Sequence, residues 1–88
     1  MIKLSGGNGE TIADAVIILG AEDTLEGIQA EKKYISKALL RIQNVDWELF
    51  GQQLIKKDGR HFDRLVIIVD SHQEKQFYFD ISEFYGKH

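Results

Sequence analysis

The stretch "VDWELFGQQLIKKDGRHFDRLVIIVD", residues 45–70, predicts a β-hairpin. Asp58 and Gly59 form an Asp-Gly pair, which favours a two-residue turn because both turn positions need positive φ. Valine, isoleucine, phenylalanine and tryptophan, which favour extended structure, occur on both sides of that pair. We therefore expect one strand over residues 45–57 and a return strand over residues 60–70.

The two-residue turn also predicts the register of the hairpin, because side chains alternate between the two faces of a strand. The expected opposed pairs are Ile55 with Phe62, Gly51 with Val66, and Leu49 with Ile68. Gly51 lies in mid-strand and is a candidate β-bulge. A bulge there would move the residues before it to the other face.

The chain continues into "SHQE", a predicted four-residue turn, and "KQFYFDIS", residues 75–82, a predicted last strand. This turn would put Phe77 beside Ile68, and Phe79 beside Val66. One face, expected beneath a helix, would then hold Trp47, Leu49, Ile55, Phe62, Val66, Ile68, Phe77, Phe79 and Ile81.

The opposite face is more apolar than a solvated face should be, which suggests a dimer interface or a partner surface. It would hold Phe50, Leu54, Leu65, Ile67, Val69 and Tyr78. The terminal segment "SEFYGKH" is expected to form a short turn that covers part of this face with Phe84 and Tyr85.

Towards the N-terminus, "TIADAVIIL", residues 11–19, predicts a first strand. "DTLE", residues 23–26, has the spacing of a capping box, with Asp23 as the N-cap and Glu26 reaching back. We expect a helix over residues 24–43, with Asn44 as a left-handed C-cap. Its apolar face would combine Gly27, Ile28, Tyr34, Ile35, Ala38, Leu39 and Ile42.

These elements predict one α+β domain over residues 1–88, in the order β-α-β-β-β. One long helix packs on a largely antiparallel four-stranded sheet. The chain has no cysteine, which excludes disulfides and thiolate chemistry and favours a cytoplasmic protein. The start, "MIKLSGG", lacks the features of a signal peptide, and the apolar run "AVIIL" is too short to cross a membrane.

The glycines at 6, 7 and 9 raise the question of a phosphate loop. Such a loop follows a strand and precedes a helix, so that backbone N–H groups converge on the anion. Here a predicted strand follows the glycines, and no lysine occupies the place that a β-phosphate requires. We expect tight turns with positive φ instead, and no cofactor.

Glu31 lies near the centre of the apolar face of the predicted helix. A buried carboxylate is costly unless it shifts its pKa or finds a partner. It is therefore either a perturbed acid or base at a site, or a structural group hydrogen-bonded to Arg64, Trp47 or Tyr78. A position open to water at the edge of a groove is a third possibility.

The other clusters of polar side chains do not predict a metal site or a catalytic site. Asp70, His72 and Glu74 alternate in "DSHQE", but no second cluster completes a metal shell, so we expect a solvated turn and no metal site. Ser71 and His72 are adjacent, which directs their side chains apart in an extended chain. We therefore expect no catalytic residue and no enzyme.

The middle of the chain is basic, since residues 32–64 carry eight bases and four acids although the net charge is −3. Its first hairpin gathers Lys56, Lys57, Arg60 and Arg64, with His61 and Phe62 between them. This pattern could bind the anionic backbone of a nucleic acid. The alternative is ordinary charge on an edge strand, which prevents aggregation.

Four segments in order, "GGNGETIADAVIILGA", "EGIQAEKKYI", "WELFGQQLIKKDGRHFDRL" and "FYFDISEFYGK", resemble a family of small, uncharacterised bacterial single-domain proteins. Lys32 and Lys33 precede Tyr34, where the family's tyrosine would follow the glutamate directly, and Phe62 replaces another tyrosine. The resemblance implies one intact domain, and because no activity is known for the family, it assigns no catalytic or ligand residue to this chain. It places Glu31, Trp47, Asp63 and Asp80 in a recurring pattern.

Three hypotheses follow. The first is a non-enzymatic module that binds another protein, or a second copy, through the apolar face with Phe50, Leu54, Leu65, Ile67 and Tyr78, or through an edge strand. The second is nucleic-acid binding through the hairpin Lys56–Arg64. The third is a small ligand-binding or hydrolytic protein that uses Glu31, and it requires a pocket opening onto that carboxylate.

Overall fold

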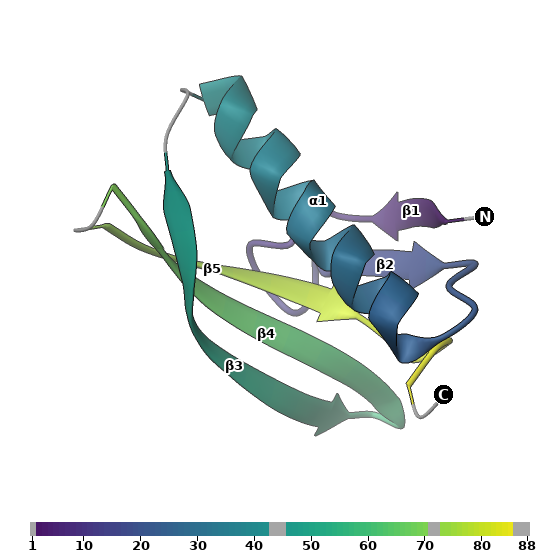
Figure 1. Ribbon diagram of the computed structural model, residues 1–88. Helices are drawn as coiled ribbons and strands as arrows, with labels where there is room; N and C mark the ends of the chain where they lie inside the picture. The colour runs from purple at the N-terminus through teal and green to yellow at the C-terminus, as the bar shows by residue number, and fades with distance from the viewer. Residues whose placement is uncertain (1, 43–45, 71–72, 86–88) are drawn as a thin grey trace.

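A computed structural model describes residues 2–42, 46–70 and 73–85. It contains one helix and five strands, so the fold is α+β (Figure 1). The elements are β1 (Lys3–Gly6), β2 (Val16–Leu19), α1 (Thr24–Ile42), β3 (Trp47–Lys57), β4 (Arg60–Val69) and β5 (Gln73–Asp80). The helix lies across one face of the sheet, and β1 and β3 are the two outer strands.

The sheet order is β1-β2-β5-β4-β3, so the expectation of four strands is wrong. The additional strand, β1, is only four residues long, carries no apolar alternation, and pairs antiparallel with β2. β2 is parallel to β5, and the other pairs are antiparallel. β2 begins at Val16, later than the strand expected over residues 11–19. The reason is that Thr11 and Asp14 form a turn, in which Asp14 N donates to Thr11 O at 3.1 Å.

The hairpin of β3 and β4 confirms the predicted two-residue turn at Asp58 and Gly59. Asp58 and Gly59 both have positive φ, at 53° and 78°. Ile55 faces Phe62 and Gly51 faces Val66, as the two-residue turn predicts. The bulge is also present, because the register shifts between Leu49 and Gly51, with Phe50 as the extra residue. Leu49 consequently faces Ile67, not Ile68.

The predicted faces of β4 are reversed. Leu65 and Ile67 lie in the core with Phe77 and Phe79, on the side that the helix covers. The cause is the connection between β4 and β5, which spans residues 70–72, so that β5 begins at Gln73 and Leu65 pairs with Phe77. A register error of an odd number of residues exchanges every side chain between the two faces.

The side opposite the helix therefore holds part of the set that was expected beneath it, namely Ile55, Phe62, Val66 and Ile68. The rest of that set is confirmed, since Phe77, Phe79 and Ile81 lie in the core and Trp47 and Leu49 are on the helix side. Phe84 is also on the other side from that expected, because it is buried in the core and its ring lies against Gly27 of α1. Tyr85 instead stacks on His61, with ring centroids 3.9 Å apart.

The helix begins at Thr24 with Asp23 as its N-cap, which confirms that part of the predicted capping box. Asp23 Oδ1 accepts a hydrogen bond from Glu26 N at 2.8 Å, which satisfies one of the free amides of the first turn. Ala30, Ile35 and Leu39 are buried against the sheet. The expected C-cap, Asn44, lies outside the described residues.

Candidate interaction surface

Strand β3 forms one edge of the sheet and is long, with 11 residues. Among the described strands it pairs only with β4, so its outer side is free of strand pairing. An edge strand presents a row of backbone N–H and C=O groups that another chain can pair with. This edge is the longest that the described part of the sheet offers, because the opposite edge, β1, has four residues.

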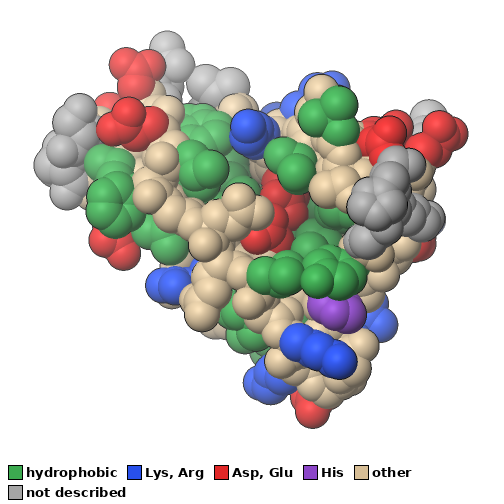
Figure 2. Space-filling view, turned by 60° about the horizontal axis from the view of Figure 1, so that its bottom comes forward, with side chains coloured by type: hydrophobic (Ala, Val, Ile, Leu, Met, Phe, Trp, Pro, Cys, Tyr) green, Lys and Arg blue, Asp and Glu red, His purple; other side chains and the backbone are tan. Residues whose placement is uncertain are grey.

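Exposed hydrophobic side chains gather on β3. Phe50 is 71% exposed, Leu54 53% and Leu49 44%, and the other large exposed hydrophobic residues are dispersed over β1, α1 and the C-terminal turn. Figure 2 shows hydrophobic side chains on the left, the side on which β3 begins in Figure 1, and a further group right of centre beside a histidine. The helix covers the core between β2 and β4, so the outermost strand extends beyond its cover.

The charges of β3 are separated along its length. Asp46 and Glu48 lie at its beginning, and Lys56 and Lys57 lie at its end. All four are exposed. The strand thus has an acidic end, an apolar middle and a basic end.

The residues predicted to form one apolar face separate in the structure. Phe50 and Leu54 are exposed on β3, but Leu65 and Ile67 are core residues and cannot touch a partner. Tyr78 is half-buried on β5, in the register position opposite Arg64 and on the side away from the helix. The reversed register of β5 accounts for these differences.

A carboxyl pair lies buried beside this strand. The Glu31 side chain is 1% exposed, and Asp63 is also buried. Gln52 Nε2, from β3, donates to both oxygens of Asp63 at 3.0 and 2.9 Å. The partner of Glu31 is therefore Asp63, and not Arg64 or Tyr78, which belong to the opposite face.

The environment of Glu31 favours its neutral form. Burial, the charge of Asp63 and a hydrogen bond with Asp63 raise the pKa of Glu31 to about 10, against a small opposing effect of Lys32. Glu31 thus keeps its proton at neutral pH and donates it in the hydrogen bond to Asp63. Its Oε1 atom has no hydrogen-bond partner within the described residues.

The space beside Glu31 is too small for a substrate. A cavity of about 20 Å³ lies between α1 and β3, lined by Ile28, Glu31, Lys32, Trp47, Leu49, Gln52 and Leu65. This volume corresponds to about one water molecule. The hydrolytic hypothesis required a pocket opening onto the carboxylate, so the geometry here favours a structural role.

The basic hairpin does not form a single basic surface. The register places Lys56 on the helix side, and Lys57, Arg60 and Arg64 on the other side. Arg60 Nε donates to Asp80 at 2.6 Å. Arg64 donates to the side chains of two glutamines, at 2.8 and 3.1 Å. Two of the four cationic groups therefore already have partners on the protein.

The glycine loop uses its amides within the protein. Gly7 N donates to Ala15 O at 3.2 Å, and Gly9 N donates to Asp14 O at 2.7 Å. Gly9 O accepts from Tyr78 N at 2.7 Å, which attaches the loop to β5. Gly6 and Gly9 have positive φ, at 82° and 85°, as expected for tight turns.

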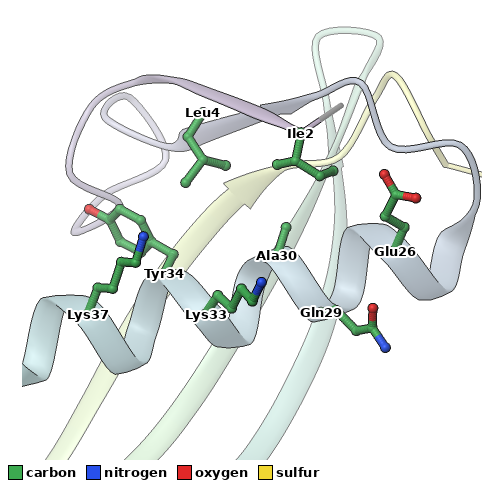
Figure 3. A pocket seen from close by; sticks show the side chains of 8 residues that line it. All are labelled: Ile2, Leu4, Glu26, Gln29, Ala30, Lys33, Tyr34 and Lys37. Atoms are coloured by element: carbon green, nitrogen blue, oxygen red, sulfur yellow. The ribbon is translucent and has the colours of Figure 1, made fainter.

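A second hollow of about 330 Å³ lies between α1 and the N-terminal segment (Figure 3). Ile2 and Leu4 point across it towards the helix, with Ile2 opposite Ala30. Lys33 and Lys37 lie along the helix at its rim. Its wall combines apolar side chains with Glu26, Gln29 and the two lysines, and the strand beside it, β1, offers only a short edge.

No protein-family model, curated protein or solved structure matches the chain. Within the described residues, no helix is long and apolar enough to cross a membrane. Across residues 2–42, 46–70 and 73–85, histidine, aspartate and glutamate side chains form no group of three that could hold a metal ion. The position of His72, from the predicted "DSHQE" turn, lies outside these ranges.

Proposed function

We propose that this protein is a non-enzymatic interaction module that binds a protein chain along the outer edge of β3. The observation that carries the proposal is the coincidence of an unpaired edge with exposed apolar side chains. Leu49, Phe50 and Leu54 are all on this one strand. In strand addition, main-chain hydrogen bonds supply affinity, and alternate side chains supply specificity.

The geometry of β3 supports this mode over docking of a helix in a groove. An 11-residue strand gives a partner strand about 35 Å of backbone to pair with. Burying the exposed parts of Leu54 and Phe50 would add apolar contact at about 25 cal/mol per Å².

Site-specific photo-crosslinking tests this proposal. A photoreactive residue replaces Gln53, an exposed side chain of β3, in protein expressed in living cells. The matched control replaces Ser5, an exposed side chain of the other edge strand, β1. We expect discrete adducts from position 53 that disappear when Leu54→Lys is added. Equal adducts from both positions, or none from position 53, would contradict the proposal.

A further inference from the structure

We infer that the chain bound along β3 is a second copy of this protein, whose own β3 pairs antiparallel with the first about a two-fold axis. The inference rests on the proposed function and names its partner. It concerns one interface, because a two-fold pairing uses the same surface on both copies.

Charge separation along β3 supports the antiparallel orientation. Asp46 and Glu48 at one end of the strand would lie beside Lys56 and Lys57 of the second copy, and the same contacts recur at the other end. A parallel orientation would instead place acid beside acid and lysine beside lysine. Opposite charges across a strand pair stabilise the pair, and like charges destabilise it.

The apolar side chains select a register. With Gln52 on the two-fold axis, Gly51 faces the second copy's Gln53. Phe50 is an extra residue in the strand, so Leu49 then faces the second copy's Leu54. Both leucines are exposed in the single chain and lie on the helix side of the sheet. The bulge is what brings them to the same face, because without it their parities would differ.

The pairing closes at two copies. The long edge of each sheet, β3, is then paired, and only the four-residue strand β1 remains at each outer edge of the combined sheet. Very short edge strands are one of the features that prevent further edge-to-edge association. The result is one continuous sheet of twice five strands, with both helices on the same side because the two-fold axis is normal to the sheet.

Light scattering at two protein concentrations tests the stoichiometry. We expect the wild type to approach twice the monomer mass at the higher concentration. Leu54→Lys should remain monomeric, because an ammonium group would face the second copy's Leu49 in the interface. The matched control is Leu25→Lys, which changes a leucine that is 65% exposed on α1 and should leave the dimer intact.

Thiol trapping tests the register, since the chain has no cysteine. Gly51→Cys and Gln53→Cys are prepared separately, and a Cβ at position 51 meets nothing within 4 Å. Directly opposed residues in an antiparallel pair have Cα atoms about 4.5–5.5 Å apart, within the range of a disulfide. On mild oxidation we expect the mixture to form the mixed disulfide in preference to either homodimer. Mass spectrometry distinguishes the three products.

The outcomes separate this inference from the proposed function. A dimer that Leu54→Lys abolishes and Leu25→Lys preserves, with the mixed disulfide, supports the inference. A wild-type monomer that still gives adducts with other proteins from position 53 overturns the inference and leaves the proposed function standing. A dimer that survives Leu54→Lys also overturns it, because its interface lies elsewhere. A monomer without adducts overturns both.

Discussion

Glu31 of α1 and Asp63 of β4 share a hydrogen bond in the interior, and Gln52 of β3 donates to both oxygens of Asp63. The three groups connect the helix, an inner strand and the edge strand. A neutral carboxylic acid bonded to a carboxylate satisfies part of the hydrogen-bonding capacity that burial would otherwise leave unmet. The arrangement therefore fixes the position of β3 relative to the helix.

The protonated state of Glu31 makes stability depend on pH. Its pKa in the folded protein, about 10, lies above the ordinary value of 4.5, so the folded state binds this proton more tightly than the unfolded state does. The stabilisation is complete below the ordinary pKa and is lost as the pH rises towards the folded pKa. The limiting slope for one group is about 1.4 kcal/mol per pH unit.

Glu31→Gln should remove this dependence, because a glutamine amide keeps the shape and can donate to Asp63 without titrating. Urea unfolding between about pH 5 and about pH 9 should show the free energy of unfolding falling with pH in the wild type and nearly level in the variant. Glu74→Gln, at an exposed position on β5, is the control and should retain the wild-type slope. Equal slopes in the wild type and in Glu31→Gln would contradict the assignment of the proton.

Gln52→Ala should destabilise the fold, because it leaves the buried Asp63 without its amide donor. The expected loss is about 1–3 kcal/mol, the cost of an unsatisfied buried polar group. Gln53→Ala removes only an exposed contact with Arg64 and should cost less than about 0.5 kcal/mol. Denaturant unfolding at low protein concentration measures both variants, and equal losses would exclude the buried network as the cause.

Gly27→Ala should also destabilise, although alanine favours helix by about 1 kcal/mol over glycine. An added Cβ would overlap the ring of Phe84, which is buried and cannot move without disturbing the core. Overpacking typically costs about 1–3 kcal/mol, so after the helix gain the net loss should be up to about 2 kcal/mol. Gly51→Ala is the matched control, since its Cβ enters open space and its thermal midpoint should change little. A more stable Gly27→Ala variant would show that Phe84 does not pack there.

Asp80 should produce a separate loss of stability in acid. Burial opposes ionisation of its carboxyl, but hydrogen bonds from Arg60 and Ser82 outweigh burial and hold the pKa of Asp80 below its usual value. A lowered folded pKa gives stability that is present above the unfolded pKa and disappears as the pH falls. Asp80→Asn should therefore flatten the acid limb of the unfolding curve between about pH 5 and about pH 2.5. Glu10→Gln, an exposed change, should leave that limb steep, and identical acid limbs in both variants would contradict this role.

The sequence predicts those parts of the fold that depend on local chemistry. The turn at Asp58 and Gly59, the cap at Asp23 and the bulge near Gly51 follow from residue types at fixed spacings. The same hairpin register also places Gln52 and Asp63 diagonally on one face of the sheet. The hydrogen bond between these two side chains could therefore have been predicted from the sequence.

Other features required contacts that the local sequence does not encode. β1 exists through its pairing with β2, since its four residues show no pattern of their own. The segment "LVIIV", residues 65–69 of β4, is apolar on both faces, so alternation of apolar and polar residues could not distinguish the two faces. The length of the β4–β5 connection alone decided which face meets the helix, and that is why Leu65 and Ile67 were misplaced.

The most direct test of the interaction surface is hydrogen–deuterium exchange of the β3 segment, residues 47–57, at low and high protein concentration. Pairing of β3 with a second copy predicts slower exchange of this segment at high concentration, with residues 3–6 of the other edge strand unchanged. It further predicts that Leu54→Lys abolishes the difference. Exchange of residues 47–57 that does not depend on concentration, or slows equally in residues 3–6, would contradict the account.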